Sequence, residues 1–430
     1  MTMISYLPAI LMFGLFALRV PIAMTLLIVT AIYFGLINTF MPQEAMIQTM
    51  VASMESFPYL AIPFFTCAGV VFNYAGITTR LMKLAELLFG HWRGGMAQVN
   101  VALSAMMGGL SGSANADAAM QTKMIVPEME RLGYDRAFST VVTAASSCIT
   151  PIIPPGIILI LYALVADVSV AKMFMAGFLP GLLLTVVLMI TVSIISRAKG
   201  YAPSRDSRAS LREIGQQMIR SIWALMLPFG IIMGLRFGVF TPTEAGAVAV
   251  VYALFVGAVV YRELKWSNLG RIVEESVLAT AGVMFIICAA NAFATYLTWE
   301  GIPSAFSSML LGSIHDPIVF LLVVNLLLLF IGLFFEGGSA IILMTPLLLP
   351  VATQMGIDPV HFGIVMAVNL TIAGFTPPVG TMMFITIAIA KVRIEDYVRH
   401  AWPFLLALVA ALLILTMVPA ISMLLPWMFL

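Results

Sequence analysis

Long apolar runs separated by short polar connections make up most of the chain. Runs such as residues 182–195, 245–260 and 404–415 form or anchor stretches of about 20 residues, the length with which a helix spans the hydrocarbon core of a bilayer. We count roughly ten such crossings, together with two shorter apolar stretches that are interrupted by glycine and small polar residues. The pattern predicts an all-α polytopic membrane protein.

Composition supports a membrane location for the chain. Of its 430 residues, 62% are hydrophobic and only 10% are charged, whereas a soluble domain has about 25% charged residues. A lipid-facing surface does not need the polar cover that a soluble fold requires. The net charge of +1 and the lack of a basic run give no indication of a nucleic-acid partner. The three cysteines lie far apart in apolar segments, as small core residues do.

Lysine and arginine mark the cytoplasmic connections of membrane proteins. They cluster in residues 80–93, 123–136, 197–220, 262–271 and 391–399, and they are absent from residues 38–58, 300–317 and 354–362. Placing the first group inside and the second outside predicts a periplasmic N-terminus. The segment 94–126 then enters from the cytoplasm and returns to it, and the segment 318–351 does the same from the outside. We therefore expect two re-entrant hairpins that point at each other.

An internal repeat appears when the sequence is shifted by 223 residues. Gly109 falls on Gly332, Pro127 on Pro350, Gly133 on Gly356, Asp135 on Asp358, Pro154 and Pro155 on Pro377 and Pro378, and Pro180 on Pro403. An odd number of crossings between the copies makes them inverted. Inverted repeats with paired helix interruptions are typical of secondary transporters, whose binding site lies near the bilayer midplane.

The repeat predicts how the chain is organised. We expect first scaffold helices in residues 1–93, a transport unit of hairpin plus broken helix in 94–165, and further scaffold helices in 166–317. A second transport unit in 318–390 and a C-terminal scaffold helix in 391–430 complete the arrangement. The basic residues Arg80, Lys83 and Arg93 are expected to reach the phosphates of membrane lipid at the cytoplasmic interface.

Each repeat carries two interruptions rich in glycine, proline and small polar residues. The hairpin tips are expected in residues 108–117 and 335–339, and the broken helices at 146–156 and 369–380. Proline and glycine end helices and free backbone groups, which survive at membrane depth only inside protein or along a wet cavity. Freed carbonyls and hydroxyls are the hard oxygen ligands that a sodium ion accepts. Helix N-termini restarting after each break offer N–H groups to an anion.

These interruptions supply the candidate site residues. The sodium ligands are expected among Ser111, Gly112, Ser113, Asn115, Ser146, Ser147, Thr150, Gly337, Gly338, Ser339, Thr371 and Thr376. The substrate-binding residues are expected among Ser113, Ala114, Asn115, Asp117, Pro154, Pro155, Gly156, Gly338, Pro377, Pro378 and Gly380. No catalytic residue is predicted, because the chain has no nucleophile–base pair or metal-ligand motif within its spans. Sodium is the only ion expected.

Several of these residues have simpler interpretations that the sequence leaves open. Asp117 is also suited to be a first-turn carboxylate, which the helix dipole favours, and Ser111 and Ser113 to be tip caps. Glu336 faces either a wet cavity or the outer surface. The spacing Gly108-x-x-x-Gly112 fits close helix packing equally well.

The stretch Thr241-Pro-Thr-Glu244 favours a structural interpretation. Threonine followed three residues later by glutamate is a capping box, with proline at the first helical position. Arg236 is a possible ion-pair partner of this segment.

At these motifs the sequence resembles the large membrane subunit of TRAP transporters (tripartite ATP-independent periplasmic transporters). The resemblance covers essentially the whole chain and rests on Gly109-Leu-Ser-Gly-Ser-Ala-Asn-Ala-Asp117, Ile149-Thr-Pro-Ile-Ile-Pro-Pro155, Phe240-Thr-Pro-Thr-Glu-Ala245, Gly356-Ile-Asp-Pro-Val-His-Phe-Gly363 and Thr376-Pro-Pro-Val-Gly380. It implies a sodium symporter of the elevator type in a bacterial or archaeal inner membrane. It also implies a small four-helix membrane subunit and a soluble periplasmic binding protein that delivers an organic anion.

The sequence leaves the substrate open among sialic acid, C4-dicarboxylates, other organic acids and sulfonates. The alternative class is a membrane protein whose hairpins are purely structural, such as an assembly subunit or an intramembrane enzyme. Matched polar breaks in both repeats favour the transporter.

Overall fold

The computed structural model describes residues 7–18, 20–38, 44–55 and 57–429, and these form helices and connections without a β-strand. The predicted periplasmic N-terminus lies outside the described residues. The helical elements in chain order are α1 (Leu7–Ala17), α2 (Ile22–Ile32), η2 (Tyr33–Ile37), α3 (Glu44–Glu55), η3 (Phe57–Leu60), α4 (Ala61–Tyr74), α5 (Ile77–Phe89), α6 (Gly95–Ser111), α7 (Ala114–Arg131), α8 (Arg136–Ser146), α9 (Ile157–Val165), α10 (Val170–Lys199), α11 (Leu211–Arg236), α12 (Pro242–Phe255), η4 (Val256–Val260), η5 (Trp266–Asn268), α13 (Leu269–Trp299), α14 (Ile302–Ser313), α15 (Pro317–Gly332), α16 (Gly337–Gln354), α17 (Pro359–Phe375), α18 (Thr381–Ala390), α19 (Ile394–Met417) and α20 (Ala420–Phe429). The prediction of an all-α polytopic chain is confirmed.

Seven segments of the described chain are long and apolar enough to cross a membrane. They are Phe57–Tyr74, Val170–Lys199, Leu211–Arg236, Pro242–Val260, Trp266–Trp299, Gly337–Gln354 and Ile394–Met417. Gly337–Gln354 is the second helix of an expected hairpin. The remaining expected crossings fall on α1, on α2 with η2, and on two helices that are broken into shorter pieces.

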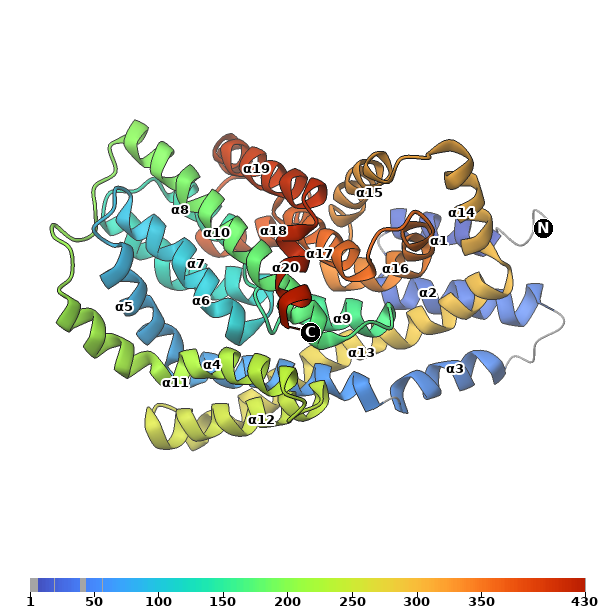
Figure 1. The fold of residues 1–430 in the computed structure, drawn as a ribbon, viewed down its shortest axis with the longest axis horizontal. Helices are drawn as coiled ribbons and strands as arrows, with labels where there is room; N and C mark the ends of the chain where they lie inside the picture. The colour runs from blue at the N-terminus through green and yellow to red at the C-terminus, as the bar shows by residue number, and fades with distance from the viewer. Residues whose placement is uncertain (1–6, 19, 39–43, 56, 430) are drawn as a thin grey trace.

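Two groups of helices pack side by side. In the first, α12 packs on α4, and α13 packs on α2, α3 and α4. The second contains α6 to α10 and α15 to α20, in which α10 packs on α6, α9, α17, α19 and α20. Figure 1 shows α3, α4, α11, α12 and α13 along one long side, with the second group above them.

The broken helices lie at the centre of the second group. Residues 360–375 of α17 and residues 137–146 of α8 are buried without interruption. A helix that is apolar or small on all faces is stable only when protein surrounds it. The break that follows α8 contacts α17 where Cys148 Sγ donates to the carbonyl of Thr371, at 3.4 Å.

The two hairpins turn more tightly than predicted. Only Gly112 and Ser113 connect α6 to α7, and residues 333–336 connect α15 to α16. Gly112 has φ +58°, and a β-carbon there would lie 2.6 Å from the carbonyl oxygen of Pro155. Only glycine fits this turn, because other residues rarely adopt that backbone and have no room for a side chain.

The helix breaks differ in length. The first connects α8 to α9 through residues 147–156, as predicted. The second contains only residues 376–380, so the predicted start at Asn369 is wrong. Residues 369–375 hold no proline and continue α17, which ends at Phe375. Thr376, directly before Pro377, has extended backbone, because the proline ring disfavours helical backbone in the residue that precedes it. The Pro154–Pro155 and Pro377–Pro378 peptide bonds are both cis.

Two peripheral predictions can also be compared with the structure. Thr241 and Glu244 form the expected reciprocal capping box at the start of α12. Arg236 places its guanidinium over the ring of Phe429, 4.4 Å from the centroid, instead of pairing with this segment. Arg80 forms an ion pair with Glu263 at 2.6 Å, and its expected contact with lipid phosphate stays a prediction.

Candidate functional site

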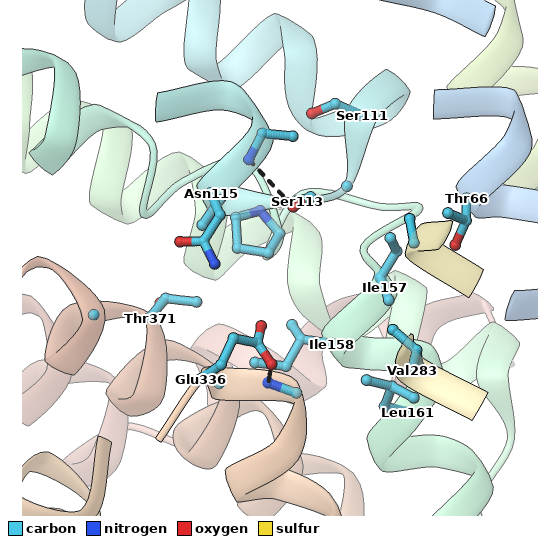
Figure 2. A pocket seen from close by; sticks show the side chains of 18 of the residues that line it. Thr66, Ser111, Ser113, Asn115, Ile157, Ile158, Leu161, Val283, Glu336 and Thr371 are labelled. Carbon is cyan, nitrogen blue, oxygen red and sulfur yellow. Dashed lines mark hydrogen bonds between the residues drawn. The ribbon is translucent and has the colours of Figure 1, made fainter. Parts of the chain in front are cut away.

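One cavity of about 230 Å³ lies between the two hairpin tips, the two helix breaks and the first group of helices (Figure 2). α4 and α13 form its outer wall. The lining residues are Thr66, Gly69, Val70, Asn73, Ser111, Gly112, Ser113, Ala114, Asn115, Ala116, Pro151, Ile157, Ile158, Leu161, Ala279, Val283, Ile286, Glu336, Gly337, Gly338, Ser339, Ile342, Leu370, Thr371, Gly374, Thr381 and Met382.

Four helices begin at this cavity. The first turns of α7, α9, α16 and α18 contribute lining residues, among them Ala114, Ile157, Gly337 and Thr381. The N–H groups of a first helical turn have no partner within the helix, and they carry the positive end of the helix dipole. The convergence therefore places four positive helix ends at the cavity, and among the described residues no basic side chain lines it.

The tip of the first hairpin presents three polar side chains. Ser113 is the N-cap of α7, and its Oγ accepts a hydrogen bond from Ala116 N at 3.4 Å. Asn115 Oδ1 accepts one from Thr381 Oγ1 at 3.3 Å, which joins this tip to α18. Ser111 Oγ is buried and has no hydrogen-bond partner among the described residues. The cap interpretation thus holds for Ser113, and Ser111 remains available as a ligand.

The tip of the second hairpin carries the one acidic residue that lines the cavity. Glu336 is the N-cap of α16, and its Oε2 accepts hydrogen bonds from Gly338 N at 3.0 Å and Ser339 N at 3.2 Å. The side chain is exposed, and it extends into the space that Ser113 and Asn115 line from the other hairpin (Figure 2). The sequence left open whether Glu336 faces a cavity or the outer surface, and the structure places it at the cavity.

Asp117 lies elsewhere, in a buried polar cluster behind the first tip, and its Oδ1 has no hydrogen-bond partner among the described residues. It is fully buried, and its Oδ2 accepts hydrogen bonds from Ser104 Oγ at 3.0 Å, Gln121 Nε2 at 2.7 Å and Thr150 Oγ1 at 2.8 Å. Neither Asp117 nor Thr150 lines the cavity. In this structure Asp117 has the position of its alternative, a first-turn carboxylate of α7, and its contact with substrate stays a prediction.

Ser146 and Ser147 also point away from the cavity. Ser146 Oγ donates to Asn100 Oδ1 at 3.1 Å, and Asn100 Nδ2 donates to Thr143 Oγ1 at 2.7 Å. Ser147 Oγ donates to the carbonyl of Thr143 within its own turn, at 2.8 Å. These bonds hold the first hairpin against α8.

The second repeat holds its hairpin in the same way. Asn369 Nδ2 donates to the carbonyl and to the side-chain oxygen of Asn325 on α15, both at 2.9 Å. Asn369 and Ser146 are equivalent under the 223-residue shift. An amide on the first hairpin helix therefore ties each hairpin to its broken helix.

Other predicted residues shape the cavity without lining it. Thr376 Oγ1 donates to the carbonyl of Ile372, at 2.7 Å. The break residues outside the lining are Pro154, Pro155, Gly156, Pro377, Pro378 and Gly380. Instead, residues that directly follow the breaks, such as Ile157 and Thr381, line the cavity. The predicted residues that do line the cavity are Ser111, Gly112, Ser113, Ala114, Asn115, Gly337, Gly338, Ser339 and Thr371.

Sequence reasoning missed the outer wall. On α4, Thr66, Gly69, Val70 and Asn73 all face the cavity. Their spacing of three, four and seven residues places them on one face of a helix. Two polar residues and a glycine on one stripe of an otherwise apolar span are the signal that identifies this face. The apolar lining residues of α13, such as Val283 and Ile286, carry no comparable signal.

The family model for the DctM component of tripartite ATP-independent periplasmic transporters matches residues 9–421. The chain belongs to this family. Its homologues are transporter permeases, and the chain is accordingly a TRAP large permease rather than an enzyme. The expected resemblance is confirmed over nearly the whole length.

Similar proteins include large permeases with different substrates in their names. The chain is 39% identical to the C4-dicarboxylate TRAP transporter large permease protein DctM of Pseudomonas aeruginosa, over 86% of this chain and 87% of that one. It is 36% identical to the sialic acid TRAP transporter large permease protein SiaM of Vibrio cholerae, over 97% of each chain. It is 35% identical to the 2,3-diketo-L-gulonate TRAP transporter large permease protein YiaN of Escherichia coli, over 94% and 95%.

A solved structure has the same fold. The YdaH transporter of Alcanivorax borkumensis superimposes with a TM-score of 0.66 at 14% sequence identity, covering 94% of this chain and 97% of that one. At this identity the TRAP permease shares the architecture of that transporter, and the match carries no argument about substrate.

Proposed function

We propose that this TRAP permease catalyses sodium-driven uptake of an organic anion, and that the anion binds in the cavity between the hairpin tips. The observation that carries the proposal is the convergence of α7, α9, α16 and α18 at a cavity lined by no basic side chain. In secondary transporters the N-termini of discontinuous helices hold anionic substrates, and the freed carbonyls hold the coupling cation.

The hairpin tips support a sodium site. α6 ends at Ser111 and α7 begins at Ala114, so carbonyl oxygens at the negative end of one helix dipole adjoin N–H groups at the positive end of another. Ser111 contributes a buried hydroxyl without a partner. The symmetric candidates on the other hairpin are Gly337 to Ser339, with Thr371 beside them in the lining.

A twofold relation between the repeats, which inverted copies would have, is supported by one contact. Cys148 and Thr371, which meet at 3.4 Å, are separated by the 223 residues that relate the two copies. Equivalent positions touch each other only near a symmetry axis, so we place the axis between the two helix breaks.

An elevator motion is supported by the position of the cavity between two packed groups. We propose that α6 to α10 and α15 to α20 move as one unit against α4 and α13. This unit includes α10 and α19, which the sequence assigned to the scaffold, because both pack on the broken helices. We further expect an inner-membrane location, a periplasmic N-terminus, a small four-helix subunit and a periplasmic binding protein that delivers the anion.

The first prediction tests sodium coupling in proteoliposomes that hold the permease with its small subunit. Uptake of the anion from its binding protein should require an inward sodium gradient. Ser111→Ala should raise the sodium concentration for half-maximal uptake by about tenfold or more, since an oxygen bonded to a charged group contributes about 1.5–3 kcal/mol. Radiolabel uptake measured against sodium concentration reports both quantities.

The matched control is Ser308→Ala, which removes an exposed hydroxyl that bonds only to its own helix. Its sodium dependence should equal that of the unmodified permease. Equal uptake with choline in place of sodium would remove sodium coupling, and would direct attention to protons, with Asp117 and Glu336 as carriers.

A further inference from the structure

The two hairpin tips present different charges at equivalent positions. Ser113 and Glu336 are related by the 223-residue shift, and each is the N-cap of the second hairpin helix. The helices that they cap, α7 (Ala114–Arg131) and α16 (Gly337–Gln354), both contain 18 residues. Both caps line the same cavity. The pseudosymmetric site is therefore asymmetric in charge at this pair of positions.

The neutral cap leaves the positive end of α7 available to an anion. Ser113 Oγ accepts a single long hydrogen bond, at 3.4 Å from Ala116 N. Asn115 adds an amide to the same wall, and Ser111 a hydroxyl without a partner. The N–H groups of this first turn attract a carboxylate, although Asp117 in the same turn offsets part of the half positive charge from its place in the buried cluster.

Glu336, the acidic N-cap of α16, makes the wall of the cavity opposite the first hairpin tip negative. Glu336 accepts hydrogen bonds from the N–H groups of Gly338 and Ser339, so a full negative charge sits on the half positive charge of α16. Among the residues that the structure describes, no other charged side chain lines the cavity to offset this charge. The remaining polar lining residues, among them Thr66, Asn73 and Thr371, are neutral. A carboxylate near Glu336 is repelled, whereas a hydroxyl donates a hydrogen bond to it.

We propose that the cavity selects a hydroxylated monocarboxylate in one orientation, with the carboxylate at the tip of the first hairpin and a hydroxyl donating to Glu336. The inference rests on the proposed function, because it assigns the substrate class of that cavity. A dicarboxylate of similar length binds less tightly, since its second carboxylate would face the carboxylate of Glu336. Glu336 is thus a specificity-determining residue of the permease.

Binding of two probes to the purified permease complex in lipid nanodiscs tests this inference. Gluconate represents the hydroxylated monocarboxylate and succinate the dicarboxylate, both added at saturating sodium chloride. In thermal-shift titrations the unmodified complex should require at least tenfold less gluconate than succinate for half-maximal stabilisation. Glu336→Gln keeps an oxygen for the helix cap but removes the charge, so it should lower the succinate concentration needed by tenfold or more.

Two variants separate charge from other effects. Glu336→Asp keeps both charge and cap, and should keep the preference for gluconate. Glu274→Gln removes an exposed charge on α13 outside the cavity lining, and should leave both titrations unchanged. Succinate binding tighter than gluconate in the unmodified complex would overturn the inference. So would a Glu336→Gln variant that weakens both ligands equally, which would leave Glu336 as a helix cap only.

Failure of the proposed function gives a different result. In that case neither gluconate, succinate nor any other organic acid would stabilise the complex in a sodium-dependent manner, and both proposals would fall. Sodium-dependent stabilisation by succinate alone would retain the transporter function and remove only the hydroxylated class.

Discussion

At the residue scale, Asp117 is the strongest polar anchor of the first hairpin. Its Oδ2 accepts three side-chain hydrogen bonds in a fully buried cluster. Asp117→Ala should lower stability by about 3–5 kcal/mol, because several buried donors lose their acceptor at about 1–3 kcal/mol each. Asp117→Asn keeps an acceptor oxygen and should cost far less. Melting temperatures of the purified variants in detergent measure the difference.

The same pair of variants tests whether Asp117 belongs to the transport chemistry. Because the residue does not line the cavity, Asp117→Asn should retain sodium-dependent uptake. A well-folded Asp117→Asn permease that no longer transports would show that the carboxylate charge itself is required for ion coupling.

At the scale of elements, small residues set how closely the first hairpin approaches its neighbours. Gly109 on α6 faces the ring of Pro228 on α11, where a methyl group would overlap it. Gly109→Ala should therefore destabilise the permease by about 1–3 kcal/mol, the usual cost of overpacking, despite the higher helix propensity of alanine. Gly215→Ala on α11 is the matched control, since nothing lies within 4 Å of a β-carbon there.

Thermal unfolding followed by size-exclusion chromatography compares the two variants. The control should melt at or slightly above the temperature of the unmodified permease. Equal melting temperatures for both variants would mean that α6 and α11 can separate without cost, and that the contact does not hold the hairpin.

Elements marked by local chemistry could be predicted from the sequence. Ser113, Gly112 and the Pro154-Pro155 break were located correctly, because caps, left-handed glycines and prolines act within a few residues. The exclusion of Asp117 from the cavity could not be predicted. Its place depends on Ser104 and Thr150, which approach it only after the hairpin folds against the break. The lining residues on α13 could not be predicted for the same reason. An apolar residue lines a cavity only where the fold places it beside one, and the sequence does not mark such a position.

The connection between the two helix groups runs through α5, and both ends of this helix are held. Gly90 O accepts hydrogen bonds from Ser204 N at 2.9 Å and Arg205 N at 3.2 Å, while Arg80 near the other end pairs with Glu263. The Gly90 end of α5 is held by backbone hydrogen bonds, whereas the Arg80 end is held by side chains, which can exchange partners. We therefore place the pivot of an elevator motion at the Arg80 end, where Gly76 adopts φ +67°.

At the scale of the whole molecule, the elevator makes a prediction about crosslinking. Thr66 on α4 and Ile157 on α9 line the cavity from the two helix groups (Figure 2). Cysteines at these two positions, in a background without Cys67, Cys148 and Cys288, should react with a short bismaleimide. If one group must slide past the other, the link should abolish uptake while sodium still stabilises the protein thermally.

The control link joins two helices of the same group. A β-carbon at Gly246 on α12 would lie 2.9 Å from that of Phe64 on α4, so cysteines there report crosslinking within the scaffold. This pair should keep its transport rate after reaction, because neither helix moves relative to the other. Undiminished uptake through a verified link between positions 66 and 157 would exclude a sliding unit, since the two groups could then not separate. The permease would instead alternate access by opening each hairpin in place, and the cavity would stay at one depth in the membrane.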